Sequence, residues 1–188
     1  EDFVSKLFVA NTHDTLLCFS SYGKVYWIKV YRLPRGGRNA KGRPIVNLLP
    51  LEKDERIQAV LPVKEFNDDQ FIFMATETGS VKKTKLSAYS RPMKSGIKAI
   101  KLRDGDRVVN AEITDGTKEI MLFSNSGKSI RFRESDARPM GRVSQGVRGM
   151  RIDKDQKIIS LVVLEEGNIL VATENGYGKQ TLKDEFSI

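Results

Sequence analysis

Short apolar segments separated by polar turns run along the chain, and several of them alternate between apolar and polar residues. Residues 108–114 and 119–124 are two such segments, and residues 128–134 form a third. An alternation with a period of two residues is typical of β-strands, whereas no segment keeps the 3.6-residue apolar period of a helix. The pattern therefore predicts an all-β protein built from short strands.

The predicted strands recur as a repeat, and one turn glycine marks each unit. The turn glycines are spaced 56, 48 and 49 residues apart: Gly23, Gly79, Gly127 and Gly176. A hydroxyl residue precedes each glycine by three positions: Ser20, Thr76, Ser124 and Thr173. Equivalent apolar segments begin farther upstream, at Phe3, Ile57, Val108 and Ile158. A period of about 50 residues is typical of propellers and other repeat architectures.

Each unit is predicted to hold four strands. The first strand joins the second by a tight turn, as at Asp115-Gly116, because Asp-Gly between apolar runs is a hairpin signal. The turn glycine leads into the third strand, and a long loop then leads to a second glycine and the fourth strand: Gly42, Gly96 and Gly146. We place the units at about 1–52, 53–103, 104–153 and 154–188 of a single domain. Four strands per unit predict a propeller-like blade, and a large barrel or a β-solenoid has the same pattern.

Composition narrows the possible chemistry. Cys18 is the single cysteine and His13 the single histidine, so neither a disulfide framework nor a Cys- or His-based metal site is expected. Cys18 lies in an apolar run and is predicted to be a buried core residue. The motifs GxxxxGK[ST], HExxH, GxSxG and CxxC are absent, and no apolar run reaches the length of a membrane span. Because the chain begins with Glu1-Asp2, we expect it to be part of a longer protein.

Basic residues are concentrated in the same part of each unit. The chain has 32 Lys and Arg against 24 Asp and Glu, a formal net charge of +8. Residues 24–43, 82–103 and 128–151 hold 22 of these basic residues but only two acids, Glu134 and Asp136. A regular stacking of units is expected to bring these three stretches to one rim. The alternative is an ordinary solvated basic surface.

A curved row of Lys and Arg on a rigid β-scaffold neutralises DNA phosphates largely regardless of base sequence. The sixth position after the turn glycine is basic in three units: Lys29, Lys85 and Arg133. The fourth position carries Trp27, Lys83 or Arg131, and residues two apart share one face of a strand. Strands offer no recognition helix, and few aromatic residues interleave the basic loops. These features favour duplex DNA held by backbone contacts and bending over single strands.

We predict that DNA is contacted by basic residues of these stretches, two loop glycines and one lysine of the fourth unit. The candidates are Lys24, Lys29, Arg32, Arg35, Gly36, Gly37, Arg38, Lys41, Arg43, Lys82, Lys83, Lys85, Arg91, Lys94, Lys98, Arg131, Arg133, Arg138, Arg142, Arg148 and Lys179. The motif Arg35-Gly36-Gly37-Arg38 is the most indicative, because adjacent glycines let backbone N–H groups approach a phosphate while arginines clamp it. The alternative is an ordinary flexible loop.

Five segments resemble the family of C-terminal domains of the bacterial DNA gyrase A protein: ANTHDTLLCFSS, GRPIVNLLPL, FMATETGSVKKT, GVRGMRI and ATENGYGK. The resemblance runs from about residue 3 to the end of the chain. It implies a β-pinwheel, a propeller-like disc of about six blades that exchange strands with their neighbours, of which this chain would supply about four. Residues 35–38 match the Arg-Gly-Gly-basic centre of the family's seven-residue box, whereas Leu33, Pro34 and Asn39 differ from it.

The resemblance also implies a function. The basic rim would wrap duplex DNA with a positive crossing, so that DNA gyrase, an ATP-dependent type IIA topoisomerase, introduces negative supercoils. No catalytic site and no cofactor are expected in this chain, since ATP and Mg belong to other parts of the holoenzyme. The implied partners are duplex DNA, the remainder of gyrase A, and gyrase B in the A2B2 holoenzyme, in the cytoplasm at the nucleoid and not at a membrane. Two alternatives stay open: the equivalent domain of a topoisomerase IV A-type subunit, and a propeller module that docks acidic protein partners.

Overall fold

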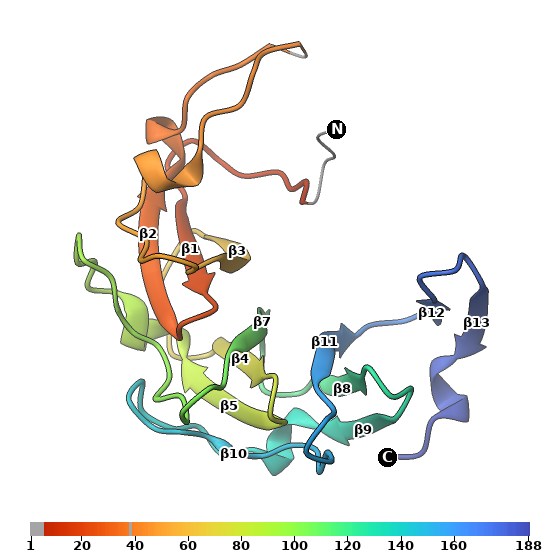
Figure 1. Ribbon diagram of the computed structural model, residues 1–188. Coiled ribbons are helices and arrows are strands. Elements are labelled where there is room, and N and C mark those ends of the chain that lie inside the picture. The colour runs from red at the N-terminus through yellow and green to blue at the C-terminus, as the bar shows by residue number, and fades with distance from the viewer. Residues whose placement is uncertain (1–5, 38) are drawn as a thin grey trace.

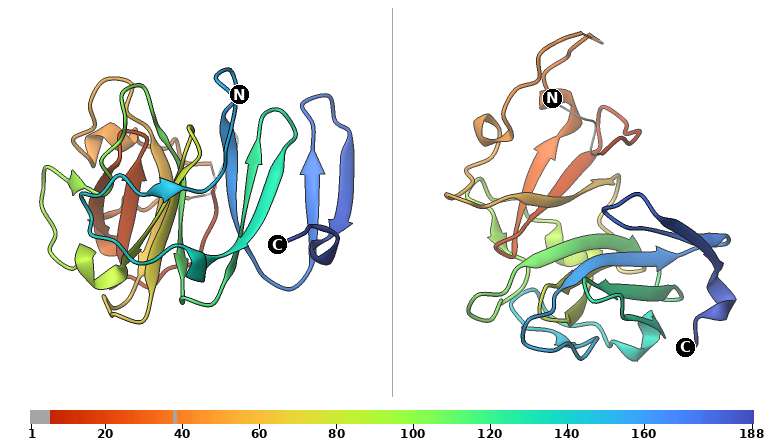
Figure 2. Two further views of the ribbon diagram at one scale, coloured as in Figure 1. Left: turned by 90° about the horizontal axis from the view of Figure 1, so that it is seen from below. Right: turned by 45° about the vertical axis from the view of Figure 1, so that its right-hand side comes forward.

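The computed structural model describes residues 6–37 and 39–188. Within these residues the chain forms antiparallel sheets and short 3-10 turns, and no α-helix. Four sheets of these described residues follow one another around an open arc (Figure 1), and two further views show them as successive layers (Figure 2). The predicted all-β class is confirmed, and the arrangement of the sheets is propeller-like.

Four sheets make up the described part of the chain. The first sheet has the order β3-β1-β2-β6, formed by Ile57–Val63, Thr15–Ser20, Lys24–Lys29 and Ile97–Lys98. The second has the order β10-β5-β4-β7, formed by Val147–Arg148, Ser80–Lys85, Phe71–Thr76 and Val108–Thr114. The third consists of β11 (Ile158–Leu164), β8 (Glu119–Ser124) and β9 (Ser129–Arg133), and the fourth of β12 (Asn168–Ala172) and β13 (Gly178–Leu182). The 3-10 turns are η1 (Val30–Arg32), η2 (Ile45–Asn47), η3 (Leu86–Tyr89), η4 (Glu134–Asp136) and η5 (Lys183–Glu185).

The first two sheets are each assembled from two successive units of the repeat. In the hairpin β1–β2, β1 pairs with β3, the first strand of the next unit, and β2 pairs with β6, the fourth strand of that unit. The hairpin β4–β5 gains β7 and β10 in the same way. Figure 1 shows β3, β7 and β11 on the concave side of the arc and β10 on the convex side. Neighbouring blades therefore exchange strands, as the resemblance implied.

The turn at Asp115-Gly116 connects two different sheets, so the prediction of a hairpin there is wrong. β7 pairs with β4, whereas β8 pairs with β9 and β11. The carboxylate of Glu134, which is fully buried, accepts hydrogen bonds from the backbone N–H groups of Gly116 (2.9 Å) and Lys118 (2.8 Å) and from the Thr114 hydroxyl (2.7 Å). These bonds fix the turn against η4 and direct its two strands to neighbouring sheets. The Asp-Gly dipeptide marks the turn but does not decide which strands pair.

The turn glycine and the hydroxyl residue three positions before it form the tip of each hairpin. In the second unit the Gly79 N–H donates to the Thr76 carbonyl (3.0 Å), and the Ser80 N–H donates to Thr76 Oγ1 (3.3 Å). The same two bonds form in the other units, at Ser20, Ser124 and Thr173. Gly79 has a φ of +85°, and a Cβ added there would lie 2.3 Å from the carbonyl oxygen of Met150 in the next unit. Glycine is therefore required both by the backbone conformation and by the close approach of the neighbouring unit.

The core lies between successive sheets, which pack face to face. On β4, Ile72 and Met74 belong to the cluster shared with the first sheet, whereas Phe73 and Ala75 belong to the cluster shared with the third. Because such a central strand is buried on both faces, its sequence reads as a continuous apolar run. The predicted burial of Cys18 is confirmed, since 1% of this residue is exposed.

The first unit contributes only its hairpin to the described sheets. The predicted first strands at Ile57, Val108 and Ile158 begin β3, β7 and β11, whereas Phe3 lies outside the described residues. The segment after Gly42 forms η2 instead of a fourth strand. Its equivalents in the next two units pair with the hairpin of the preceding unit, and no hairpin precedes β1 in the described residues. A unit of the sequence repeat is thus not a unit of sheet pairing.

Gly79→Ala is expected to lower the free energy of unfolding by more than about 2 kcal/mol. The left-handed backbone costs about 1 kcal/mol with a Cβ, and the overlap with Met150 costs at least about 1 kcal/mol more. Gly127→Ala is the matched control, because Gly127 has a φ of +80° but no atom within 4 Å of an added Cβ. We expect the control to lose about 1 kcal/mol. Urea denaturation measures both losses, and equal values would show that the approach of Met150 does not constrain the fold.

Candidate nucleic-acid interface

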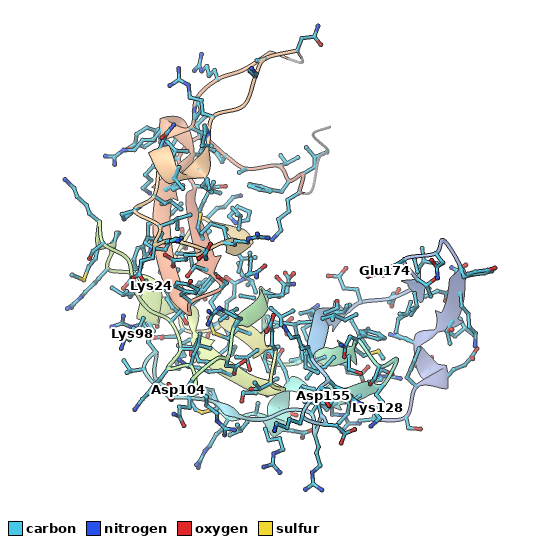
Figure 3. The ribbon with its side chains drawn as sticks, in the orientation of Figure 1. Lys24, Lys98, Asp104, Lys128, Asp155 and Glu174 are labelled. Atoms are coloured by element: carbon cyan, nitrogen blue, oxygen red, sulfur yellow. The ribbon has the colours of Figure 1, made fainter. Side chains whose placement is uncertain are left out.

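The convex edge of the arc is formed by the third strands, the loops that follow them and the short fourth strands. Lys24 of β2 and Lys98 of β6 are directly opposite each other in the antiparallel pair, and Figure 3 shows both on this outer flank. Like charges in directly opposite positions repel each other. Lys24 forms an ion pair with Glu52, whereas Lys98 has no ion pair within the described residues. An anion bound at this place would relieve the repulsion.

Most of the predicted contact residues are exposed. The exposed ones are Lys29, Arg32, Arg35, Gly36, Gly37, Lys41, Arg43, Lys85, Arg91, Lys94, Lys98, Arg133, Arg138, Arg148 and Lys179. Lys24 and Arg142 are half-buried, and Arg38 lies outside the described residues. Figure 3 shows nitrogen-tipped side chains projecting from the convex side of the arc, so that an anionic partner has access to them.

The sixth position after the turn glycine ends each of the first three hairpins at the edge of its sheet. Lys29, Lys85 and Arg133 occupy this position and are all exposed. Lys85 Nζ lies 3.7 Å from Oδ1 of Asp68, an ion pair in which both side chains are more than half exposed. Such a solvated pair contributes little to stability, so the lysine is free to exchange the carboxylate for a phosphate.

The prediction that the fourth position faces a partner is wrong for Lys83 and Arg131. Only 4% of Lys83 and 7% of Arg131 is exposed. Lys83 Nζ donates to the backbone carbonyl of Glu134 (2.8 Å), and Arg131 Nη1 donates to the backbone carbonyl of Lys183 (2.7 Å). The 3-10 turn of the next unit covers the strand at this point. A period of two residues identifies the face of a strand but not what packs against that face.

Lys82 is buried as well, with 0% exposed, so the prediction that it contacts DNA is also wrong. Its Nζ donates to the backbone carbonyl oxygens of Ala99 (2.5 Å) and Arg142. Burial, with the charge of the Arg142 guanidinium as a second cause, lowers the pKa of Lys82 to about 7. Ala99 and Arg142 come from successive units, so this side chain joins two neighbouring units in the interior.

The loop that contains Arg35, Gly36 and Gly37 is exposed throughout its described residues. The Ala40 N–H donates to the Gly37 carbonyl (3.0 Å), which forms a tight turn. An added Cβ at Gly37 would meet no atom within 4 Å, and neither glycine has a positive φ. Gly37 is therefore not demanded by the fold, whereas a Cβ added at Gly36 would lie 3.2 Å from the Ala40 Cβ. The small size of both glycines leaves the backbone N–H groups open to an anion.

A hollow beside the second hairpin holds three arginines, two of which were not among the predicted contacts. It has a volume of about 470 Å³ and is lined by Thr78, Arg103, Arg148, Met150, Arg151 and Ile152. Arg148 was predicted, whereas Arg103 and Arg151 were not. Arg103 follows β6 and Arg151 follows β10, so the packing of the two units brings them together. Both residues lie in the basic stretches, so the charge pattern contained the signal, but their convergence depends on the strand exchange.

Several acidic side chains of the linking turns serve the fold. Asp106, 2% exposed, accepts hydrogen bonds from the backbone N–H (3.1 Å) and hydroxyl (2.7 Å) of Thr78. Glu55, 6% exposed, accepts bonds from the Tyr26 hydroxyl (3.1 Å) and the Glu52 N–H (2.8 Å). Among the described residues, no group of three His, Cys, Asp or Glu is placed to hold a metal ion. Nor does the described part of the chain contain a helix long and apolar enough to cross a membrane.

Sheets that follow an arc and exchange strands with their neighbours define a propeller-like β-repeat domain. A family model described as "DNA gyrase C-terminal domain, beta-propeller" matches residues 14–64, 70–115, 118–165 and 167–188. The chain belongs to this family.

Relatives and solved structures agree with that assignment. The DNA gyrase A proteins of Salmonella typhimurium and Escherichia coli are each 54% identical over 187 residues, which is 99% of this chain and 21% of each relative. The chain thus spans about a fifth of the length of these curated relatives. The C-terminal domain of DNA topoisomerase IV matches with a TM-score of 0.85 and 31% identity, over 94% of this chain and 55% of that chain. The DNA gyrase A C-terminal domain matches with a TM-score of 0.76 and 29% identity, over 94% and 57%. The resemblance to the gyrase A C-terminal domain and the β-pinwheel fold are confirmed.

Lys82→Met is expected to remove a pH dependence of stability. The pKa of Lys82 is about 7 in the folded protein and 10.5 as its ordinary value, so the unfolded chain binds more protons between these two values. The free energy of unfolding should therefore rise with pH from 7 to 10 relative to the variant, by at most about 1.4 kcal/mol per pH unit. Urea denaturation of both proteins at several pH values measures this rise. A difference that stays constant with pH would contradict the expectation.

Proposed function

We propose that this chain binds duplex DNA along the convex edge of the arc and wraps it there, in support of negative supercoiling by DNA gyrase. The observation that carries the proposal is the recurrence of exposed cations at equivalent positions of successive units, as at Lys29, Lys85 and Arg133. Such a row neutralises phosphates and releases counterions. Contacts to the phosphate backbone position the duplex but do not read its bases, so binding is independent of sequence.

Wrapping requires the contacts of several units at once. Bending 20–30 base pairs by 40–90° costs about 1–6 kcal/mol. The phosphate contacts of one unit leave little binding free energy beyond this bending cost. The contacts of three successive units act together on one continuous duplex and share the cost. The long loops add cations at similar places in the repeat: Arg35, Arg91 and Arg138. The three arginines of the hollow beside Thr78 supply a further phosphate contact between two units.

The place of the domain within an enzyme follows from its relatives. Membership of the gyrase family and the 54% identity to DNA gyrase A proteins support a role in DNA gyrase. The domain itself carries no catalytic step and holds neither ATP nor Mg, which act elsewhere in the holoenzyme. Its protein partners are the remainder of gyrase A and the gyrase B protein, in the cytoplasm where the chromosome lies.

A second candidate is the equivalent domain of a topoisomerase IV A-type subunit. The TM-score of 0.85 with the topoisomerase IV domain exceeds the 0.76 with the gyrase A domain, and this favours the second candidate. Sequence identity favours the first, since the matching DNA gyrase A proteins are 54% identical over nearly the whole chain. We give the sequence more weight, because both structural matches have similar identities of 31% and 29%.

Replacing Arg35, Arg91 and Arg138 together by Ala is expected to weaken duplex binding to all sequences alike. Each lost phosphate contact should reduce the slope of log affinity against log salt concentration by about 0.9, so the triple variant should lose about 3. Fluorescence anisotropy with duplexes of two unrelated sequences, over salt concentrations from about 50 to 200 mM, measures both quantities. A loss confined to one sequence would indicate direct base readout instead.

The control for this variant is the replacement of Lys53, Lys64 and Lys154 by Ala. These lysines are also exposed but lie outside the three basic stretches. Their replacement removes the same net charge as the first variant. If binding depended only on the net charge of the domain, both variants would weaken it equally. Displacement of DNA by polyglutamate at equal charge concentration would instead support a module that docks acidic proteins.

Wrapping is tested by DNA topology. A nicked circle is ligated with the domain bound, the protein is removed, and the linking number is compared with that of circles ligated alone. A positive crossing predicts an increase in linking number that grows with the amount of bound protein. Binding without any change in linking number would show that the domain binds DNA but does not wrap it.

A further inference from the structure

One position of the repeat is buried or half-buried in three units although its side chains are hydrogen-bond donors. This is the fourth position after the turn glycine, which we name the latch position: Trp27, Lys83, Arg131 and Gln180. We propose that Trp27 and Lys83 at the latch position are positioning residues, which hold the basic loop of the next unit in place for DNA without touching DNA themselves. The inference rests on the proposed function and adds to it a set of residues that act from the interior.

A similar contact is made across three successive boundaries between units. Trp27 Nε1 donates to the backbone carbonyl of Tyr89, at the end of η3 (2.9 Å). Lys83 Nζ donates to the carbonyl of Glu134, at the start of η4 (2.8 Å). Arg131 Nη1 donates to carbonyls at the start of η5 and just after it, namely those of Lys183 (2.7 Å) and Phe186 (3.0 Å). An indole, an ammonium and a guanidinium thus each donate to a backbone carbonyl in the 3-10 turn of the following unit, although not to the same position of the turn.

The charges of the two basic members are satisfied inside the protein. Lys83 Nζ lies 3.9 Å from Glu134 Oε2 and 5.2 Å from the centre of the Phe71 ring. Arg131 Nε donates to Glu119 Oε2 (3.0 Å), and its Nη2 lies 3.5 Å from Asp184 Oδ1. Removing one partner of such a buried pair is more costly than losing a surface contact. These cations therefore serve the boundary between units and not a phosphate.

The 3-10 turns that receive these bonds are the starting points of the basic loops. η3 ends at Tyr89, two residues before Arg91, and η4 begins at Glu134, four residues before Arg138. The far end of the first of these loops leads into β6, which pairs with β2 of the preceding unit, and the far end of the second leads into β10, which pairs with β5. Each loop is thus held at both ends by the unit before it. At the near end, η3 and η4 follow directly on β5 and β9 of their own units, and the bond at the latch position adds a contact to the preceding unit.

The test uses Lys83→Met and Lys83→Arg in the whole 188-residue chain. Hydrogen exchange is followed at the amides of Ala137 and Met140, which lie in the loop that Lys83 holds and donate to backbone carbonyls (3.2 and 2.8 Å). Their exchange should become at least tenfold faster in Lys83→Met and return to normal in Lys83→Arg. The amides of Ser90 and Gly96, in the loop that Trp27 holds, should not change. Faster exchange in both loops would mean a general loss of stability and would overturn the proposal.

Trp27→Phe provides the reciprocal variant, since it keeps an aromatic ring in the core and deletes the donor. It should speed exchange at Ser90 and Gly96 and leave Ala137 and Met140 unchanged, so the proposal is tested even if Lys83→Met does not fold. Gln180→Met is the control, because Gln180 occupies the same position but is exposed, with no following unit in the described residues. The control should change neither loop.

Affinity for a mixed-sequence duplex is measured on the same proteins. Lys83→Met should bind three- to tenfold more weakly, with Lys83→Arg close to the unsubstituted chain. Faster exchange at Ala137 with unchanged affinity would show that holding the loop does not affect DNA binding. Unchanged exchange would show that Lys83 at the latch position does not hold the loop. If the unsubstituted chain itself fails to bind duplex DNA, the proposed function fails, and the exchange experiment still decides whether the latch exists.

Discussion

Backbone hydrogen bonding between a hairpin of one unit and two strands of the next is the interaction on which the rest of the structure depends. A hairpin alone has two rows of unpaired N–H and C=O groups and is marginally stable in water. β3 and β6 fill both edges of β1–β2, and β7 and β10 fill both edges of β4–β5. Because each of these sheets is completed by its neighbour, the spacing between sheets is fixed, and equivalent loops reach equivalent places on the convex edge.

The positive charge of the chain is divided between two tasks. Lys82, Lys83 and Arg131 are buried at boundaries between units, where carbonyl oxygens and carboxylates satisfy them. Many of the cations that remain at the surface lie at the ends of third strands, in long loops and on the fourth strands. The formal charge of +8 is therefore not spread evenly over the surface, because the place of each cation within the unit decides whether it faces solvent or a neighbouring unit.

The repeat phase made much of the fold predictable from the sequence. The spacing of glycines and hydroxyl residues identified the hairpin tips, and the strands at 108–114 and 119–124 have the predicted bounds. Partner choice was not predictable from local signals, because Asp115-Gly116 is a proper turn whose strands are separated by the distant carboxylate of Glu134. The prediction that Lys83 is exposed was wrong for the same reason. The alternation identifies the face of the strand on which Lys83 lies, but η4 of another unit covers that face. Long-range packing decided both cases.

The strand exchange separates the period of the sequence from the period of the structure. A cut between residues 103 and 104 falls at a boundary of the sequence repeat, yet it would take both flanking strands, β7 and β10, away from the hairpin β4–β5. Duplication of the second or third unit in a gene would conserve the sheets, because both units offer equivalent strands to the hairpin before them. The number of blades can thus change in evolution by whole repeats, while no single repeat carries a complete sheet of its own.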